Sequence, residues 1–232
     1  MVEIAGKNIV VTGGARGLGA ALVQEIIDRG ANTVYSTART AFSDGRPAVV
    51  PRELDVRSTE SVNALAASAS DTQIVFNNAG VFVFEPLLGG SLDTTIDTFD
   101  TNVVGPLRVA RAFAPVLAAN GGGAIVNMLS VVSWLAGAGA YGASKAAAWS
   151  LTNSLRIELA AQHTHVLGVH AGFIDTDMAA ALPVPKLSPA EVARRIVDAL
   201  EAGADELLVD ELSTQAKAAL SGPVEGLTLS VG

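Results

Sequence analysis

The alternation of short β-rich runs with longer helical runs is the feature that most constrains the fold of this chain. Seven short runs have the apolar, β-branched character of buried strands: Lys7–Thr12, Asn32–Ala38, Ala48–Leu54, Thr72–Asn77, Ala124–Ser130, Thr164–His170 and Glu206–Val209. Helical patterns occupy Gly17–Arg29, Ser58–Ala69, Leu92–Ala119 (with an interruption expected near Asn102), Tyr141–Ala161, Ser188–Ala202 and Ser213–Leu220. Parallel strands need long crossovers, so this alternation predicts an α/β fold of the Rossmann type. We expect a doubly wound parallel sheet of about seven strands with helices on both faces.

Composition limits the classes of protein to which the chain can belong. Half of its 232 residues are apolar and 16% are charged, which is typical of a folded domain. We find neither linker nor repeat, and so expect a single domain over residues 1–232. The net charge of −8 would repel nucleic-acid phosphates. Cysteine is absent, and we see neither a signal peptide nor an apolar run of the roughly 18–20 residues that a membrane helix needs, so we expect a soluble, cytoplasmic protein.

A glycine-rich turn follows the first predicted strand and leads into the first predicted helix. It reads Thr12-Gly13-Gly14-Ala15-Arg16-Gly17-Leu18-Gly19. Glycines allow a tight turn and a close approach of the backbone to a ligand, and a helix N-terminus offers free N–H groups to a pyrophosphate. The alternative is an ordinary strand-to-helix turn, but its place after the first strand favours a phosphate-binding loop.

Two polar side chains at the start of a predicted helix suggest acid–base chemistry. Tyr141 and Lys145 are four residues apart and therefore share a helix face. A nearby ammonium should lower the pKa of the phenol and allow proton exchange near neutral pH. Ser130 ends a strand just before this helix and would hydrogen-bond a substrate oxygen. An exposed helix pair and a turn serine are the alternatives, and Ser133 is a competing serine.

Taken together, these motifs resemble the compact, single-domain branch of the short-chain dehydrogenase/reductase family. The resemblance covers residues 7–178 and rests on the glycine turn, Asn77-Asn78-Ala79-Gly80 after the fourth strand, Ser130, and Tyr141-Gly142-Ala143-Ser144-Lys145. It implies that Asn102, Ser130, Tyr141 and Lys145 are catalytic. Asn102 would hold a water near the lysine in a proton relay, and a surface asparagine is the alternative.

The resemblance also implies a set of cofactor-binding residues. Asp55 and Val56 would meet the adenine, although Asp55 is equally explained as a turn or capping residue. Asn77 and Gly80 would border the cofactor, and Ile174 and Thr176 would meet the nicotinamide carboxamide. The full set is Gly13, Ala15, Arg16, Gly17, Leu18, Gly19, Ala38, Arg39, Asp55, Val56, Asn77, Ala79, Gly80, Tyr141, Lys145, Gly172, Ile174 and Thr176.

The sequence departs from the family at two places near this site. The loop from Ser130 to Tyr141 is about two residues shorter than is usual, by the resemblance, which would trim the substrate wall. His170-Ala171-Gly172 replaces the family's usual Pro-Gly, which should loosen the turn near the nicotinamide.

The end of the second strand indicates which dinucleotide is preferred. An NAD site places a carboxylate there to bind the ribose 2′-hydroxyl, but this chain has Ala38 followed by Arg39. Arg39 and Arg16 would both contact a 2′-phosphate, unless both are ordinary surface charges. We therefore expect NADP(H).

These expectations describe an NADP-dependent carbonyl reductase or alcohol dehydrogenase. It would transfer a hydride between the nicotinamide and a ketone, aldehyde or secondary alcohol, and the short, apolar segment 178–188 favours a hydrophobic substrate. A non-catalytic dinucleotide sensor and an extended-branch epimerase or dehydratase are the alternatives.

The helices Leu92–Ala119 and Tyr141–Ala161 would form the interface of a homodimer or homotetramer, with Trp149 and Leu151 as anchors. No metal is expected from His163, His165 and His170.

Overall fold

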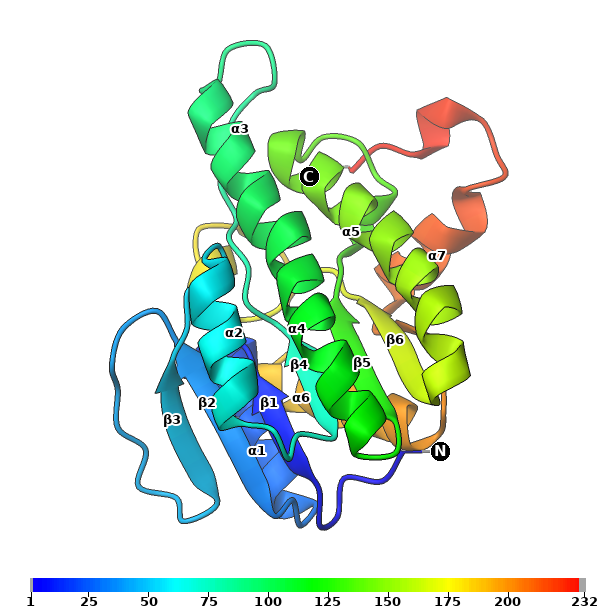
Figure 1. The fold of residues 1–232 in the computed structure, drawn as a ribbon. Helices are drawn as coiled ribbons and strands as arrows, with labels where there is room; N and C mark the ends of the chain where they lie inside the picture. The colour runs from blue at the N-terminus through cyan, green and yellow to red at the C-terminus, as the bar shows by residue number, and fades with distance from the viewer. Residues whose placement is uncertain (1, 230–232) are drawn as a thin grey trace.

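A seven-stranded sheet, parallel throughout, runs through the computed structural model, which describes residues 2–229 (Figure 1). The strands are β1 (Asn8–Val11), β2 (Thr33–Ala38), β3 (Val49–Glu53), β4 (Ile74–Asn77), β5 (Gly123–Met128), β6 (Thr164–His170) and β7 (Glu206–Leu208). The α-helices are α1 (Gly17–Asp28), α2 (Thr59–Ser68), α3 (Leu92–Phe99), α4 (Gly105–Ala119), α5 (Gly139–Leu159), α6 (Pro189–Glu201) and α7 (Glu211–Ala219). The predicted doubly wound α/β fold is therefore confirmed.

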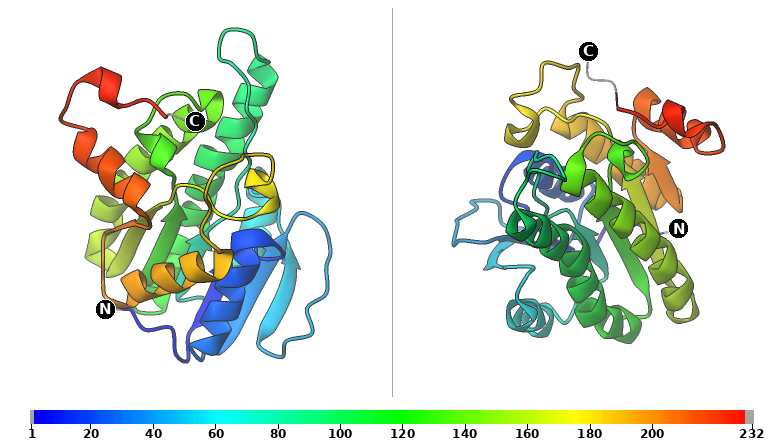
Figure 2. Two further views of the ribbon diagram at one scale, coloured as in Figure 1. Left: turned by 180° about the vertical axis from the view of Figure 1, so that it is seen from behind. Right: turned by 90° about the horizontal axis from the view of Figure 1, so that it is seen from above.

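Helices cover both faces of the sheet, so the central strands are apolar on both sides. Helices α1 and α6 pack side by side on one face, where Leu22 and Ile196 are fully buried (Figure 2). Helices α2, α4 and α5 cover the other face, which buries Phe113 and Leu117. All four residues of β4 are buried, as this two-sided packing requires.

A π-helical turn, Asp100–Val104, joins α3 to α4 and confirms the interruption expected near Asn102. Such turns widen a helix by one residue and often lie at functional sites. Here the turn buries Asn102, which is 2% exposed, so the alternative of a surface asparagine is wrong.

The strand order is β3-β2-β1-β4-β5-β6-β7, and it reverses direction between β1 and β4. Ligands of open parallel sheets bind beyond the carboxyl ends of the strands at such a switch point. The glycine turn, the segment after β4 and Ser130 all lie at that edge.

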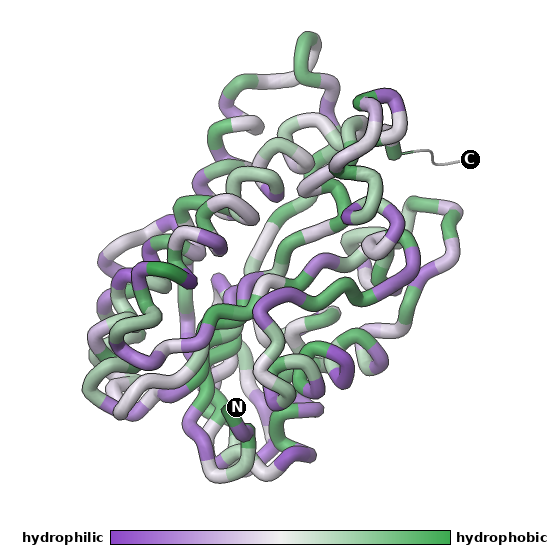
Figure 3. Tube along the Cα trace, turned by 90° about the vertical axis from the view of Figure 1, so that its right-hand side faces the viewer, coloured by the Kyte–Doolittle hydropathy of each residue, from purple (hydrophilic) through white to green (hydrophobic). Residues whose placement is uncertain are grey.

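The segment between β4 and α3 projects from the molecule. Its tip is hydrophobic (Figure 3), and Phe84, Leu87 and Leu88 are all exposed.

At the other side of this edge, α7 and residues 220–229 pack against residues 131–138 in a small core of their own. Trp149 joins that core by packing edge-on against Trp134 at 5.8 Å between ring centroids, and Leu151 packs on the α4–α5 core. The two predicted interface anchors are thus engaged within the chain. Within residues 2–229, none of the helices has the length and hydropathy needed to cross a membrane.

Candidate active site

The glycine turn between β1 and α1 can be built only from glycines at its closest points. Gly13 has φ +68°, a left-handed conformation that disfavours side chains. A Cβ on Gly19 would lie 2.0 Å from the Gly13 carbonyl oxygen. The side chain of Arg16, the N-cap residue of α1, makes no capping hydrogen bond. The turn therefore leaves the first N–H groups of α1 available to an anion, as a dinucleotide pyrophosphate requires.

Thr12 and Asn78 fix this turn against the end of β4, and neither was among the predicted site residues. The Thr12 hydroxyl accepts the backbone N–H groups of Asn78 and Ala79, both at 3.0 Å. The Asn78 amide in turn donates to the Thr12 carbonyl at 2.9 Å. Thr12 belongs to the glycine-turn motif and Asn78 to the motif after β4, so the sequence did point to both positions. What the sequence did not reveal is that they bond to each other across 66 positions.

Other predicted cofactor residues lie around the turn. Leu18 is nearly buried, which leaves its backbone as the group available to a ligand. Thr176 contacts the turn, because a Cβ on Gly17 would lie 3.3 Å from its methyl group. The segment that carries Thr176 is held by a bridge between Ile174 and Leu187. Thr176 therefore lies near the glycine turn, and the contact of Ile174 and Thr176 with the nicotinamide stays a prediction.

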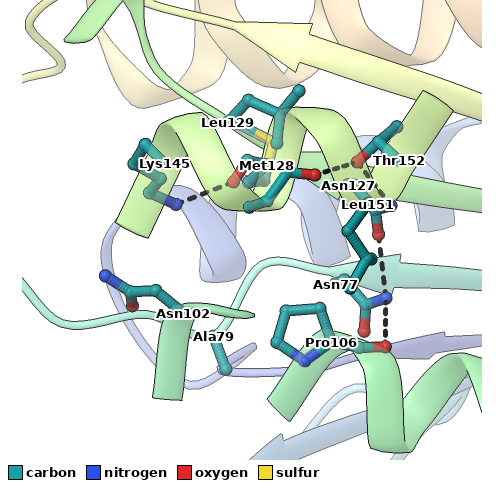
Figure 4. Close-up of a pocket in the computed structure, with 11 residues that line it drawn as sticks. Asn77, Ala79, Asn102, Pro106, Asn127, Met128, Leu129, Lys145, Leu151 and Thr152 are labelled. Carbon is teal, nitrogen blue, oxygen red and sulfur yellow. Dashed lines mark hydrogen bonds between the residues drawn. The ribbon is translucent and has the colours of Figure 1, made fainter. Parts of the chain in front are cut away.

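The Asn77 side chain lies in the interior of the molecule. Its side chain is 4% exposed and donates to the Asn127 side chain at 2.9 Å; the Asn127 amide donates in turn to Thr152 at 3.0 Å (Figure 4). The Asn77 side chain therefore belongs to a buried polar chain on the α4–α5 side of the sheet. Only its backbone is left to border a cofactor.

A small cavity of about 10 Å³ lies beside this polar chain, and the side chains of Lys145 and Asn102 help to line it (Figure 4). That volume is about what one water needs, and the polar lining would supply its partners. Gly80 keeps the space open, because a Cβ there would lie 3.2 Å from Asn102 Oδ1 and 3.9 Å from Lys145 Nζ.

Asn102 is held rigidly at this place. Its Oδ1 accepts the Val81 N–H at 2.9 Å, and its Nδ2 donates to the Val81 carbonyl at 3.0 Å and to Ser144 Oγ at 3.1 Å. Both amide hydrogens thus have protein acceptors. One lone pair of Oδ1 is the part of the side chain left for a water.

Lys145 is buried, and its Nζ donates to the Met128 carbonyl at 2.7 Å. Burial lowers the pKa of Lys145 to about 8, since the ammonium loses its hydration. Its Nζ lies 5.7 Å from the centroid of the Tyr141 ring, so the two side chains do share one face of α5 as predicted.

Burial also decides the ionisation of Tyr141. It raises the pKa of the phenol to about 12, and hydrogen bonding with the Ser130 side chain opposes that rise. The predicted lowering of this pKa by Lys145 is therefore wrong for this arrangement, where loss of hydration is the largest influence on the phenol. The Tyr141 ring also packs edge-on against Phe82, at 4.9 Å between centroids.

Ser130, and not the competing Ser133, is the serine beside the phenol. Its Oγ donates to the Ala171 carbonyl at 3.4 Å and accepts the Val132 N–H at 3.3 Å. The Ser133 hydroxyl is buried and has no hydrogen-bond partner among the described residues.

The predicted adenine and phosphate side of the site lies at the ends of β2 and β3. Ala38 ends β2, and Arg39 is exposed after it. Asp55 accepts the Arg57 backbone N–H at 3.0 Å, and this bond, with a smaller contribution from the charge of Arg39, lowers the pKa of Asp55. Asp55 therefore does act as a turn residue, and its carboxylate lies within reach of the Arg39 charge. Ser58, not Asp55, caps α2.

Arg16 and the turn after β6 complete the edge. Arg16 is 80% exposed at its side chain and lies 4.0 Å from Asp177, a weak pair that leaves it free to move. The Gly172 N–H donates to Asp210 at 2.7 Å. This bond joins the turn after β6 to the start of α7, and Asp210 was not among the predicted site residues. Among residues 2–229, no three His, Asp or Glu side chains gather into a metal site.

Comparison with known proteins agrees with this geometry. The family model for short chain dehydrogenases matches residues 7–185. A short chain dehydrogenase from Burkholderia cenocepacia, solved in complex with NADP, is 36% identical, with a TM-score of 0.92 and 97% of each chain covered. A 3-oxoacyl-[acyl-carrier-protein] reductase of Vibrio harveyi is 31% identical over 196 residues, which is 78% of this chain and 79% of the relative. A Burkholderia phymatum short chain dehydrogenase solved with NAD, at 24% identity and a TM-score of 0.83, shares the fold. This chain is accordingly an oxidoreductase of the short-chain dehydrogenase/reductase family, whose members use NAD(P)(H).

Proposed function

We propose that this enzyme is an NADP(H)-dependent carbonyl reductase, reversible as an alcohol dehydrogenase, and that residues 1–232 form one domain that both binds the dinucleotide and carries the catalytic groups. The observation that carries the proposal is the convergence of Ser130, Tyr141 and Lys145 beside the glycine turn. Gly13 approaches Ala79, and the adjacent Gly80 approaches Lys145, so the two halves of the site are contiguous. The fit of the glycine turn to a pyrophosphate supports the cofactor.

The proton chemistry is assigned to Tyr141. When bound, the nicotinamide supplies the hydride that a carbonyl carbon takes up, or accepts it from an alcohol. Tyr141 gives its Oη proton to the carbonyl oxygen, and its raised pKa keeps that proton on the phenol until the oxygen becomes basic. In the alcohol direction the same oxygen takes the proton back.

Ser130 and Lys145 support that transfer. The Ser130 hydroxyl donates a hydrogen bond to the substrate oxygen as negative charge grows there. Lys145 stabilises the phenolate that forms, and its lowered pKa lets it exchange a proton with the water that the cavity beside Asn102 is sized to hold. Asn102 fixes the position of that water through Oδ1.

A hydrophobic ketone is the proposed substrate. The Tyr141 phenol is flanked by Phe82, and the segment that continues from Phe82 carries the exposed Phe84, Leu87 and Leu88. Met178, half-exposed, lies in the segment after β6. The Vibrio harveyi relative is named as a reductase of 3-oxoacyl groups, which are ketones with an acyl chain. These features support a shallow, apolar site for a bulky or chain-bearing ketone.

The test is NADPH oxidation against a panel of aromatic, aliphatic and cyclic ketones, with Tyr141→Phe as the decisive variant. The substitution removes the acid and leaves the glycine turn intact, so kcat should fall by about 10²–10⁴-fold while the Kd for NADPH stays nearly the same. A variant that keeps more than about a tenth of the wild-type kcat would remove Tyr141 from the mechanism. Binding of NADPH without turnover of any ketone would instead favour the dinucleotide sensor.

A further inference from the structure

His170 is a fully buried titratable side chain that the proposed reaction does not use. It ends β6 with 0% of its surface exposed. Its Nδ1 lies 3.0 Å from the backbone carbonyl oxygen of Ser130. A carbonyl can only accept, so Nδ1 must carry the hydrogen, and the tautomer is fixed.

The other ring nitrogen has no hydrogen-bond partner among the described residues. The nearest acidic oxygen to Nε2 belongs to Glu206, at 3.6 Å, and Glu206 is engaged by Lys217 at 2.8 Å. A buried nitrogen without a hydrogen-bond partner lowers the stability of the folded state, so the burial of this imidazole calls for an explanation. The single bond it makes is the one to Ser130.

Aromatic rings hold the imidazole in place. Trp134 stacks on it at 3.8 Å between centroids with 19° between planes, and Trp149 meets it edge-on at 6.4 Å. Lys217 Nζ lies 5.0 Å and 5.3 Å from the centroids of these two indoles. The ring therefore has little freedom to rotate away from Ser130.

The backbone around Ser130 is consequently hydrogen-bonded at three neighbouring positions to residues at the end of β6 and just after it. Leu129 N–H donates to the Val169 carbonyl at 2.8 Å and Val131 N–H to the Ala171 carbonyl at 2.9 Å. Between these two bonds, the carbonyl of Ser130 accepts two hydrogen bonds, one from the Ser133 N–H at 3.0 Å and one from the His170 side chain at 3.0 Å. The direction of a serine hydroxyl follows its backbone, so a shift of this carbonyl re-aims Oγ relative to Tyr141.

We propose that His170 is a positioning residue for the reaction: its Nδ1–H fixes the Ser130 backbone and so aims the serine hydroxyl at the substrate oxygen and at Tyr141. The inference rests on the proposed function for its catalytic consequence. Positioning of this kind must be tight, because sites misplaced by about 1 Å lose most of their activity.

The charged groups that face His170 are Glu206 on β7, Lys217 on α7 and Lys145 on α5. Burial is the strongest influence on the ring and lowers the pKa of His170 to about 4. The imidazole is therefore neutral throughout the pH range of an ordinary assay, and the Nδ1–H bond persists across it.

Two amide substitutions separate the two ring nitrogens. The Asn side chain places an N–H near the position of Nδ1, whereas the longer Gln places one near Nε2. We expect His170→Asn to keep kcat within about threefold and His170→Gln to lose tenfold or more, with an unchanged Kd for NADPH in both. Equal kcat values for the two variants, with Ser130→Ala impaired, would overturn the inference.

A double-substitution cycle separates positioning from general stability. If His170 acts through Ser130, His170→Gln costs nothing further in kcat once Ser130→Ala is present. If instead the two losses in kcat multiply in the double variant, His170 has a structural role only and the inference is overturned.

Nuclear magnetic resonance gives a readout that does not depend on turnover. With ¹⁵N-labelled histidine we expect His170 as the Nδ1–H tautomer at pH 7, and the opposite tautomer would overturn the inference. With ¹³Cζ-labelled tyrosine, the Tyr141 signal should move in His170→Gln and stay in place in His170→Asn. If these spectra are as expected while no ketone is turned over, the proposed function fails and the contact with Ser130 stands.

Discussion

At the scale of single residues, burial governs the chemistry of this site more than pairwise charge does. Tyr141 and Lys145 lie close together, yet each has its pKa moved towards the neutral form, to about 12 and about 8. Loss of hydration disfavours the phenolate and the ammonium alike. Burial therefore keeps the proton on the phenol, which is the form that the proposed carbonyl reduction needs.

We propose that single residues also decide the cofactor preference. A 2′-phosphate would gain charge-assisted bonds from Arg39 and Arg16, each worth about 1.5–3 kcal/mol. We expect at least about a tenfold preference for NADPH over NADH in kcat/KM. The double change Ala38→Asp with Arg39→Leu should reverse it, because the carboxylate binds a ribose 2′-hydroxyl and repels a phosphate.

The control for this switch is Arg52→Leu, which removes a cation from β3 that stacks on Tyr35, 5.9 Å from its ring centroid. It should leave the preference unchanged. Equal use of the two cofactors by the wild-type enzyme, or a double variant that still favours NADPH, would refute this interpretation of the second strand.

Histidine burial predicts a pH dependence of stability. The pKa of His170 is about 4 in the folded chain and about 6.5 in an unfolded one. The unfolded state thus binds more protons between these values, and the free energy of unfolding falls as pH drops from about 6.5 to about 4, by up to about 3 kcal/mol. His170→Asn cannot titrate and should show a smaller fall in urea unfolding at pH 6.5 and pH 4.5. Parallel losses in the two proteins would contradict the assigned pKa.

At the scale of elements, periodicity and turn residues predict strands and helices well, and polar pairing poorly. The predicted boundaries agree with the observed ones to within a few residues: Tyr141–Ala161, for example, becomes α5, Gly139–Leu159. The glycine turn, Ser130 and Tyr141 come together because parallel strands end at one edge. The inward turn of Asn77 depends on Asn127, 50 positions away, and no local pattern encodes such a pair.

The same limit explains the place of His170. Its position at a strand end was visible in the sequence, but its acceptor is the carbonyl of a residue 40 positions earlier. Trp134 and Trp149, which lie 15 positions apart in the sequence, both pack against its ring. Their shared contact with the His170 ring depends on the path of the loop after β5, which no local sequence pattern encodes.

The first turn of α1 offers a test at this scale. Gly19→Ala would place a Cβ 2.0 Å from the Gly13 carbonyl oxygen, so the turn must shift. We expect a loss of about 1–3 kcal/mol in the free energy of unfolding, as for other overpacked sites, and a weaker affinity for NADPH. Gly45→Ala is the matched control, because nothing lies within 4 Å of a Cβ there. Wild-type NADPH affinity in Gly19→Ala would show that the turn does not contact the cofactor.

At the scale of the whole molecule, we propose a homodimer or homotetramer built on α3, α4 and α5, which are the helices of the predicted segments Leu92–Ala119 and Tyr141–Ala161. Trp149 packs against Trp134 within the chain. The exposed large apolar residues of these helices are Leu92 and Ile96 on α3 and Ile157 on α5, of which Ile157 is the most exposed. We expect sedimentation to give a dimer or larger species at micromolar concentration, and Ile157→Asp to weaken it. Val224→Asp, in the distant turn after α7, is the control and should keep the dimer. A monomeric wild-type enzyme would refute the assembly.

The pairing of α1 with α6 has a consequence for how the chain is made. Arg29, at the end of α1, bonds to Glu201 of α6 at 2.7 Å, across 172 positions, and the buried side chains of the two helices share one core. A ribosome that has produced the glycine turn must therefore synthesise most of the remaining polypeptide before α1 finds its neighbour. Until then the part of the apolar face of α1 that α6 covers is exposed to solvent or to a chaperone. A nascent chain arrested before residue 189 should accordingly be a target for chaperones and proteases, although it already carries every residue assigned to hydride and proton transfer.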